Sequence, residues 1–354
     1  NGDVRTTREY SAGIVGYVDD RMIIEDCVNY GDISFTDDSY ETLGGILGYV
    51  KTTAEVSVAR CFNHGDINNA YHGGGIAGYF ETSQGVVEDC ANTGSVNSED
   101  SYNGGLMGYV YLSSSGRISV RNCYSVAESI TASSYVGGLF GYLERTTSGA
   151  LEDGDAIYVD NCYSVAKTIE GDVAGTVVGR AVGGSEMYFY RVYAQALSGM
   201  NAFGENGGVL GEPIEKSAAE MKADAFLNLL SSHFSGDAKD APMNNGYPVL
   251  LSEVGQTVPE DKSTAKVSFK VTAGDQVIEN PQVTLLARDS KEGIVAKNGK
   301  YELAAGEYLY RVVVLGYERI CGSFLIDQQN QGDITIELTL TPCDEGTKWN
   351  PHQI

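Results

Sequence analysis

The 354-residue chain is poor in proline (7), has a single tryptophan, and carries only 24 lysines and arginines against 48 aspartates and glutamates. The formal net charge of −24 repels phosphate backbones, which argues against a nucleic-acid partner. No apolar run reaches the roughly 20 residues that a membrane-spanning helix needs. No charged-then-apolar leader opens the chain either. We therefore expect a mature or excised fragment that makes no membrane contact.

Histidine is also scarce, and its placement excludes one class of enzyme. A zinc peptidase needs two histidines one helical turn apart with a glutamate between them. The four histidines are not arranged in this way: His64, His72, His233 and His352. Neither a Gly-x-Ser-x-Gly elbow nor a phosphate-binding Walker loop occurs in the sequence. The sequence thus predicts no catalytic residue, no cofactor-binding residue and no metal ligand.

Glycine is abundant, with 44 residues, and much of it belongs to an internal repeat. A Gly-Gly-apolar-apolar-Gly-Tyr unit recurs at steps of 32, 30, 30, 33, 38 and 32 residues, and its last two copies are degenerate. Such a period is typical of repeat architectures. The copies start at Ala12, Gly44, Gly74, Gly104, Gly137, Gly175 and Gly207.

A second signature lies inside each unit, where two apolar residues alternate at strand spacing and a cysteine follows. The first three copies continue with an Asn-x-Gly turn at Asn29, Asn63 and Asn92. Short apolar runs with glycine punctuation favour strands, so each unit is interpreted as three short strands. The recurrent position is occupied by Cys27, Cys61, Cys90, Cys123, Cys162 and, in the sixth copy, Val192.

A unit of about 30 residues made only of strands cannot bury its apolar side alone, but stacked units cover one another. The expected fold class is therefore all-β, with a repeat-built β-solenoid (β-helix) of about seven repeats over residues 1–212. Arg145–Ala156 is expected to form a polar loop.

Residues 213–251 are interpreted as a capping helix and closing segment. Ser217 and Glu220 form a capping-box pattern, and Asn244–Leu250 reads Asn-Asn-Gly-Tyr-Pro-Val-Leu. Exposed strand edges invite aggregation, so we expect this segment to cover the open end of the solenoid. The apolar face of the helix is expected to hold Met221, Phe226, Leu227, Leu229, Leu230 and Phe234.

The rest of the chain predicts a linker over 252–264, a β-sandwich over 265–343 and a tail over 344–354. Turn signals such as Asn298-Gly299 separate alternating segments at sandwich spacing. The predicted strands are Ala265–Val271, Gln282–Ala287, Lys300–Leu303, Tyr308–Val314, Gly322–Ile326 and Asp333–Leu340.

Two resemblances follow from these patterns. GGLMGY at 104–109 and GGLFGY at 137–142 resemble the GLUG motif of bacterial surface proteins and of some immunoglobulin A peptidases. This resemblance covers about residues 10–212 and implies an exported bacterial protein, without implying peptidase activity. Residues 299–317 resemble prealbumin-like and carboxypeptidase-regulatory-like modules, which implies an Ig-like sandwich.

Three patterns could carry chemistry, and each has a plainer structural explanation. Acidic pairs beside the cysteines, with Arg60 and Arg121 interspersed, could act in a β-helix lyase or glycosidase, or could simply form a solvated corner. Asp153-Gly-Asp155 lacks the ligand spacing of a calcium loop, and Cys61 with His64 lacks a second pair for zinc. The acidic residues are Glu25, Asp26, Glu88, Asp89 and Asp160.

Two ladders are also expected from stacking. The motif tyrosines would stack either as a sugar-binding strip or, as we favour, as a column that keeps the coils in register. The five repeat cysteines would form a buried ladder of free thiols, because in-register side chains point the same way. Pairing of Cys321 with Cys343 stays open. The tyrosines are Tyr17, Tyr49, Tyr79, Tyr109 and Tyr142.

Three functions compete on this basis. The first is a non-catalytic, extracellular module on a bacterial cell surface, used for adhesion, display or scaffolding. The second is a carbohydrate-binding module, and the third is a β-helix polysaccharide lyase or glycosidase. The expected partner is a host or bacterial surface protein or a glycan, and the fragment itself is expected to be a monomer.

Overall fold

The computed structural model describes residues 2–343 except 37–40, 100, 114, 147–155, 259, 261, 288–289, 291 and 327–329, and it describes no side chain at 184–186. Most of the predicted polar loop and the whole predicted tail lie outside these residues. The chain divides into two compact units, Asn1–Val258 and Pro259–Ile354. Within the described residues no helix is long and apolar enough to span a membrane.

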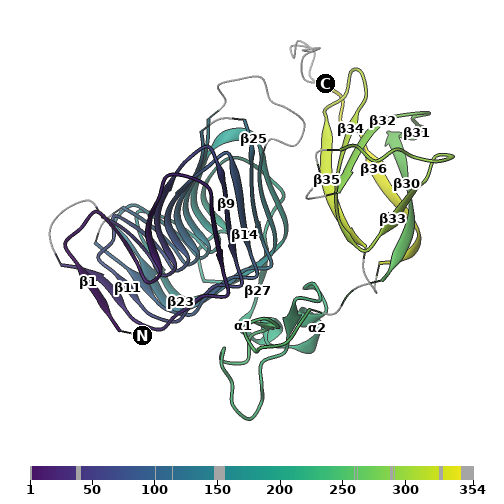
Figure 1. Ribbon diagram of the computed structural model, residues 1–354. Helices are drawn as coiled ribbons and strands as arrows, with labels where there is room; N and C mark the ends of the chain where they lie inside the picture. The colour runs from purple at the N-terminus through teal and green to yellow at the C-terminus, as the bar shows by residue number, and fades with distance from the viewer. Residues whose placement is uncertain are drawn as a thin grey trace. The chain divides into compact units, whose positions relative to one another are not determined.

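The first unit is a β-helix-like stack in which the chain winds through successive coils (Figure 1). Each of the first three full coils contains five short strands rather than the three that the sequence predicts, whereas in the later coils neighbouring strands merge, so that β21, β22 and β23 make up one coil. The strands are β1(Val4–Thr6), β2(Tyr10–Ala12), β3(Val15–Val18), β4(Met22–Glu25), β5(Val28–Asn29), β6(Ile33–Phe35), β7(Thr42–Gly44), β8(Leu47–Lys51), β9(Glu55–Ala59), β10(Phe62–Asn63), β11(Ile67–Asn68), β12(His72–Gly74), β13(Ala77–Glu81), β14(Gln84–Glu88), β15(Ala91–Asn92), β16(Val96–Asn97), β17(Tyr102–Gly104), β18(Met107–Leu112), β19(Arg117–Arg121), β20(Tyr124–Thr131), β21(Tyr135–Gly137), β22(Phe140–Arg145), β23(Ala156–Glu170), β24(Val173–Gly175), β25(Val178–Gln195), β26(Phe203–Leu210) and β27(Ile214–Lys216).

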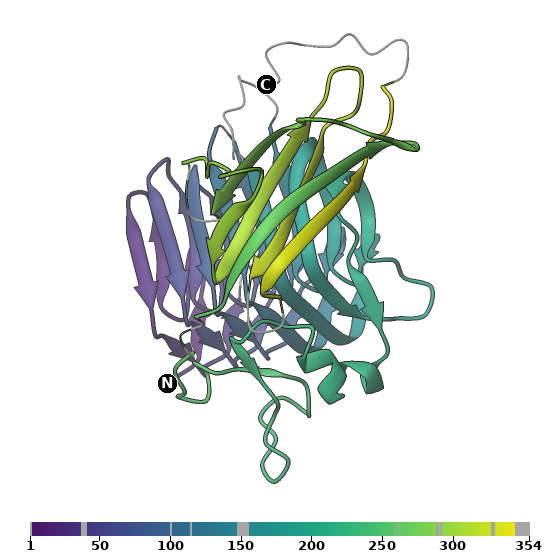
Figure 2. The same ribbon diagram turned by 90° about the vertical axis from the view of Figure 1, so that its right-hand side faces the viewer.

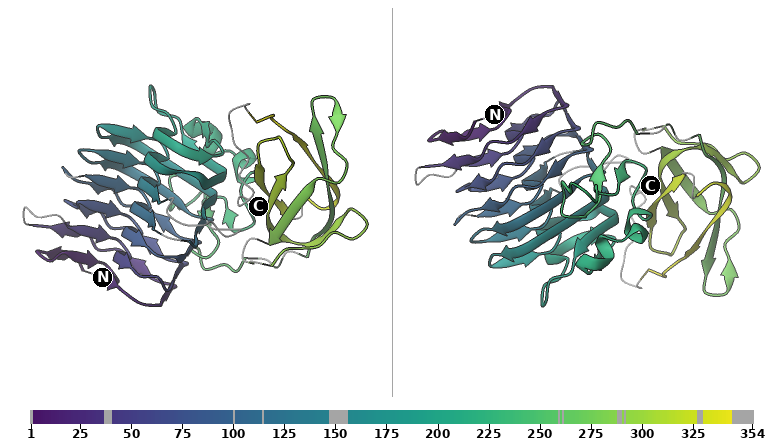
Figure 3. Two further views of the ribbon diagram at one scale, coloured as in Figure 1. Left: turned by 90° about the horizontal axis from the view of Figure 1, so that it is seen from above. Right: turned by 90° about the horizontal axis from the view of Figure 1, so that it is seen from below.

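Strands of successive coils pair in parallel, so equivalent repeat positions become direct neighbours (Figure 3). The expectation of an all-β, β-helix-like chain therefore agrees with the structure. The first positions of the glycine pairs form one column in the sheet of β2, β7, β12, β17, β21 and β24, in the order Ala12, Gly44, Gly74, Gly104, Gly137 and Gly175.

Close approach explains the second glycine of the pair. A Cβ added at Gly75 would lie 2.1 Å from Cγ of Asn92, which lies across the same coil, and no real contact is that short. Asn92 belongs to a buried amide ladder, in which Asn29 Nδ2 donates to Asn63 Oδ1 at 2.7 Å and Asn63 Nδ2 to Asn92 Oδ1 at 2.8 Å. The Gly-Gly and Asn-x-Gly signatures therefore belong to one packing arrangement, in which the asparagine side chain lies against the second glycine of the pair.

The predicted start of a seventh repeat at Gly207 is wrong. The structure pairs Val178 with Phe203 and Val182 with Gly207, so Ala202–Gly204 takes the place that the motif occupies in earlier coils. The last step is shorter than the others because the chain returns through a brief turn after Gln195. The Gly-Gly at 207–208 instead follows the motif position, within β26.

The interior of the coil is a continuous apolar core, built largely from the paired apolar positions and the cysteines. A second cluster lies on an outer flank, where the residue after each cysteine is apolar or aromatic in nearly every coil. This flank column contains Phe62, Ala91, Tyr124, Tyr163 and Tyr193.

The predicted cap covers this flank and not the open end of the stack. Residues 217–258, which we call the strap, bury Met221, Phe226, Leu230, Phe234 and Leu250 against the flank column. The single predicted helix is two four-residue helices, α1(Ala218–Met221) and α2(Asp224–Leu227), although the capping box at Ser217 and Glu220 is present. A short hairpin of β28(Phe234–Ser235) and β29(Val249–Leu250) completes the strap.

The first part of the predicted linker 252–264 belongs to the strap. Ser252–Gly255 forms a turn on Leu250 and Leu251, and Tyr124 donates a 2.5 Å hydrogen bond to Glu253. Burial raises the pKa of the Glu253 carboxyl. The connecting segment therefore shortens to the residues between Gln256 and Ser263.

The second unit contains two sheets of mainly antiparallel strands (Figure 2). Its six longer strands agree with the predicted ones within two residues at each end, and their inward residues share one core. The strands are β30(Thr264–Ala273), β31(Gln276–Val277), β32(Gln282–Ala287), β33(Tyr301–Ala304), β34(Gly306–Val313), β35(Ile320–Ile326) and β36(Gly332–Thr339).

Candidate functional site: an aromatic strip and a polar corner

The motif tyrosines form the column that the repeat predicts, with each one paired to its equivalent in the next coil. Tyr17 pairs with Tyr49, Tyr49 with Tyr79, and so on to Tyr142, which pairs with Arg180; Glu205 follows Arg180 in the column. The Arg180 guanidinium lies 5.3 Å and 5.9 Å from the rings of Tyr135 and Tyr142. A cation therefore covers one end of the column.

A second aromatic column stands beside the first, and the sequence reasoning missed it. Its members occupy the position two residues before the glycine pair on β2, β12, β17 and β21, while Thr42 takes this position on β7. That fixed spacing could have revealed it. The two columns together, which we call the aromatic strip, add Tyr10, His72, Tyr102 and Tyr135 to the five motif tyrosines.

The rings of the aromatic strip pack against one another. Tyr49 stacks on Tyr79 with centroids 4.6 Å apart and planes 9° apart, and His72 stacks on Tyr102 at 5.1 Å and 16°. Contacts between the columns are mostly edge-on or tilted. Sugar binding uses free ring faces, and the stacked pairs of this strip cover some of those faces with a neighbouring ring.

Burial in the strip also perturbs its titratable groups. It raises the pKa of Tyr49 to about 12 and lowers the pKa of His72 to about 3. The His72 ring is within hydrogen-bond reach of the Thr42 hydroxyl, at 3.2 Å. Both shifts favour the neutral form, as desolvation does for any group among packed rings.

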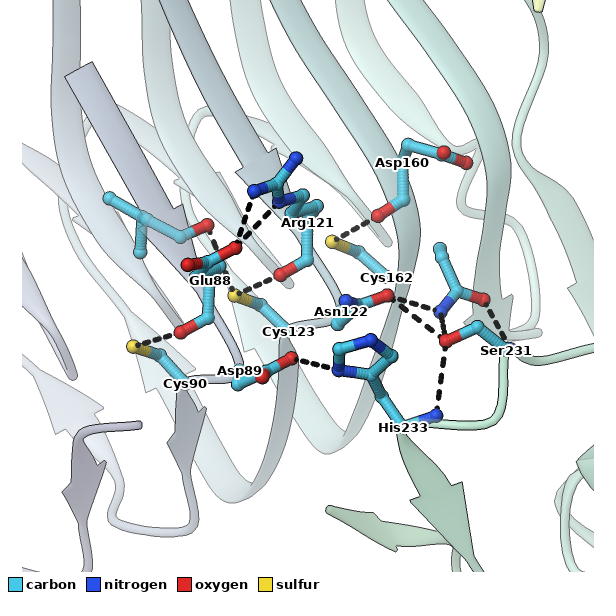
Figure 4. Close-up of polar contacts among 12 residues, drawn as sticks. Glu88, Asp89, Cys90, Arg121, Asn122, Cys123, Asp160, Cys162, Ser231 and His233 are labelled. Carbon is cyan, nitrogen blue, oxygen red and sulfur yellow. Dashed lines mark hydrogen bonds and ion pairs between the residues drawn. The ribbon is translucent and has the colours of Figure 1, made fainter. Parts of the chain in front are cut away.

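The acidic residues beside the cysteines lie at one corner of the coil, which we call the polar corner (Figure 4). The residue before each cysteine has a left-handed backbone, with φ of 55° at Asp26, 52° at Arg60 and 52° at Asp89. This turn points the side chains of adjacent coils toward each other. The remaining left-handed members are Asn122, Asn161 and Arg191.

Arginines of the next coil neutralise most of these carboxylates. Arg60 Nε donates to Asp26 at 2.7 Å, and that contact lowers the pKa of the Asp26 carboxyl. Arg121 lies 2.6 Å from Glu88 (Figure 4). Arg191 binds Asp160 through two nitrogens, at 2.9 and 2.5 Å, and Asp160 is fully buried. The corner is thus an ion-pair column and not the solvated corner of the plainer interpretation, since Asp89 and Asp160 are buried.

Polar contacts at the same corner fasten the strap. His233 Nδ1 lies 2.8 Å from Asp89, and the buried Ser231 hydroxyl donates to Asn122 and accepts from Asn161 (Figure 4). Ser231 Oγ accepts the backbone N–H of His233 and makes no contact with its ring. The three residue types therefore do not form a nucleophilic triad, whose serine must contact the imidazole.

The repeat cysteines form one column facing the core, and all seven cysteines of the chain are free in the structure. Cys61, Cys90, Cys123 and Cys162 are buried, whereas Cys27 in the first coil is half-buried. Each thiol donates to the carbonyl two residues earlier, as Cys123 does to Arg121 at 3.0 Å. Burial raises the pKa of the Cys123 thiol well above its ordinary value.

The remaining candidates are not brought together. His64 stacks on Tyr30 and contacts the Thr93 hydroxyl, while Cys61 faces the core. Asp153-Gly-Asp155 and His352 lie outside the described residues. Nowhere in the described part of the chain do three metal-ligating side chains gather.

No protein-family model and no curated protein matches the chain. Among solved structures, 69% of the chain is similar to 88% of a crystal structure from Bacteroides ovatus named "putative immunoglobulin A1 protease". The two chains share 17% sequence identity and superpose with a TM-score of 0.41. A likeness of this degree carries no argument about activity.

Proposed function

We propose that the chain is a non-catalytic module of an extracellular bacterial surface protein, serving adhesion, display or scaffolding. The observation that supports it most is the ion-pair column of the polar corner. A carboxylate bound to a guanidinium stays ionised and oriented, which suits it poorly to donating a proton as a general acid. The acidic pairs are thereby engaged in holding neighbouring coils together.

The finer fold assignment belongs to the same proposal. The first unit is a repeat-built β-solenoid of the GLUG-resembling kind, and the second is an Ig-like, prealbumin-like sandwich. The parallel register of six glycine-pair positions supports the solenoid. The shared core of the two sheets supports the sandwich. Bacterial origin and export rest on the resemblance alone, with a surface protein or glycan as partner.

The two alternatives have less support. Glycan binding would use ring faces, and in the aromatic strip several of these stack on other rings. Two tyrosines of the strip are exposed, Tyr10 and, at the end of the column, Tyr17. A lyase or glycosidase would need Glu88 or Asp160 free of its arginine.

Activity and glycan arrays on the full chain test the proposal. We expect no turnover of polysaccharide or protein substrates. Reproducible turnover that Glu88→Gln abolishes would overturn it in favour of the enzyme. On a glycan array, saturable binding that Tyr17→Ala removes without changing the melting temperature would favour the carbohydrate-binding alternative. Tyr30→Ala is the matched control, because Tyr30 lies outside the strip and is 57% exposed, against 49% for Tyr17.

A further inference from the structure

Asparagine followed by glycine can rearrange without an enzyme, and the chain contains five such pairs. The backbone nitrogen after the asparagine attacks the side-chain amide carbon, and glycine has no side chain to hinder the approach. Asparagine is accordingly one of the thermolabile residues. Asn1-Gly2 begins outside the described residues. The other four pairs begin at Asn103, Asn206, Asn245 and Asn298.

The structure restrains the asparagine side chain in the first two of these four pairs. Asn103 is fully buried, and its Nδ2 donates to the Thr131 carbonyl at 2.6 Å. Asn206 is exposed, but its Oδ1 accepts the backbone N–H groups of Gly208 and Val209, at 3.0 and 2.8 Å. Ring closure requires the side-chain amide to turn toward the next backbone nitrogen, so these bonds must break before either pair can react.

The remaining two pairs occupy turns of the same kind. Asn245 and Asn298 are both exposed and have left-handed φ values of 54° and 52°. The glycines that follow them have φ values of 87° and 75°. Positive φ at both central residues is the reason that Asn-Gly is favoured in tight turns. Exposure and backbone conformation therefore do not distinguish the two sites.

The two turns differ in the partner of the glycine N–H. Gly246 donates to Asp237 Oδ2 at 2.8 Å, so its nitrogen is engaged by a carboxylate. Among the described residues, none accepts the N–H of Gly299. Its turn is closed by two bonds between Lys297 and Lys300, of 2.8 and 3.1 Å, which leave the central peptide group to the solvent.

Charge acts in the same direction as this hydrogen bond. The lone pair of a peptide nitrogen is delocalised, so the attack needs the deprotonated amide. The Asp237 carboxylate opposes a negative nitrogen at Gly246, because like charges repel. The residues that flank Gly299 in its turn, Lys297 and Lys300, are both cationic. Hydrogen bonding and charge thus both protect Asn245 and leave Asn298 reactive.

From this contrast we propose that Asn298 is a site of spontaneous deamidation. The Gly299 nitrogen bonds to Cγ of Asn298 while the bond from Cγ to Nδ2 breaks. The displaced amide nitrogen takes up the proton of the Gly299 N–H and leaves as ammonia. Water then opens the five-membered imide at one of its two carbonyl carbons, which gives aspartate or isoaspartate. The whole change consumes one water and releases one ammonia, and nothing is oxidised or reduced.

Both products change the turn in which they form. Each places a carboxylate where a neutral amide stood, between Lys297 and Lys300. Isoaspartate also routes the backbone through Cβ and so lengthens the two-residue turn by one atom. The pairing of Lys297 with Lys300 is fitted to the shorter turn, so the modification alters the second unit at this hairpin and leaves the coils unchanged.

Peptide mapping of the full chain, incubated in buffer and in urea, tests the proposal. Cleavage after glutamate releases residues 293–302, in which mass and chromatography identify the aspartate and isoaspartate products. In urea the four pairs should react at similar rates. In the folded chain Asn298 should react at least about tenfold faster than Asn245, the factor expected for one hydrogen bond to a charged group.

Two variants assign the cause. In Asp237→Ala the rate at Asn245 should rise toward that at Asn298, while the slow rate at Asn206 shows that the coils remain folded. Asn298→Gln is the matched control, and it should form no acidic product in residues 293–302. A folded wild type in which Asn298 reacts no faster than Asn245 would overturn the proposal. An Asn245 that stays unreactive in Asp237→Ala would also count against it, because the carboxylate would then not be the protecting group.

Discussion

The two units build their cores from different neighbours. In the coil, a residue packs on the residue at the same repeat position of the next turn. Residues of one type therefore form columns, of glycine, asparagine, cysteine or tyrosine. In the second unit, residues from separate antiparallel strands meet in one shared core, and no position recurs. The coil is thus ordered in one dimension, whereas the core of the second unit is shared between two sheets.

This difference decides which residues each unit tolerates inside. A buried asparagine is costly alone, but in the coil each amide donates to the next, so the ladder satisfies itself. The same repetition makes the coil sensitive, because one wrong side chain interrupts contacts on both sides. In the second unit a substituted residue contacts neighbours of different kinds, so its effect is not repeated along a column.

The largest effect is expected from a methyl group in the glycine column. Gly75→Ala places a Cβ 2.1 Å from Cγ of Asn92, so we expect the coil to lose more than about 4 kcal/mol of its unfolding free energy. Gly293→Ala in the second unit is the matched control, as nothing lies within 4 Å of its added Cβ. Urea denaturation measures both. A loss below about 1 kcal/mol at Gly75 would contradict the column model of packing.

The second-largest effect is expected from acid, which should lower the stability of the first unit more than that of the second. Burial lowers the pKa of His72 to about 3, against 6.5 when unfolded. Between these two pH values the His72 imidazole is protonated in the unfolded chain but neutral in the folded coil. The free energy of unfolding of the coil therefore decreases as the pH falls from about 6.5 toward 3. We expect about 1 kcal/mol or more by pH 4. His72→Gln should reduce this pH dependence and leave the second unit unchanged. An identical pH profile in the variant would refute the assignment.

Cleavage between the units should cost little stability. The first cuts in limited proteolysis are expected between Gln256 and Ser263, since Glu253 before them is held by Tyr124. Each fragment should keep its own melting transition within a few degrees of the intact chain. Early cuts inside the coils, or loss of either transition, would show that the units depend on each other.

The smallest effect concerns thiol access. The four buried ladder cysteines should resist a thiol reagent in the native state, while Cys27, Cys321 and Cys343 react. All seven should titrate after unfolding without reductant. A mass showing two disulfides within the ladder would contradict the free-thiol column. The free energy of unfolding should be the same with and without reductant, because no disulfide bond is present to be reduced.

Sequence alone determined the features that depend on local pattern. The repeat period, the strand class and the cysteine column follow from residue spacing, because parallel stacking turns a period directly into neighbours. The strands of the second unit were equally predictable, as alternation and turn residues mark them. The prediction at Gly207 was wrong because the last coil is shorter than the others. The motif position therefore falls at Ala202–Gly204, although a Gly-Gly pair still stands at 207–208.

Only the tertiary structure decided what each column meets. The strap binds the flank because Tyr124, Tyr163 and Tyr193 form an apolar face there, which becomes visible only when the coils are stacked. The arginine–carboxylate pairs likewise join residues about one repeat apart across a left-handed turn. A local pattern states which side of a strand is apolar, but three-dimensional packing determines what covers it.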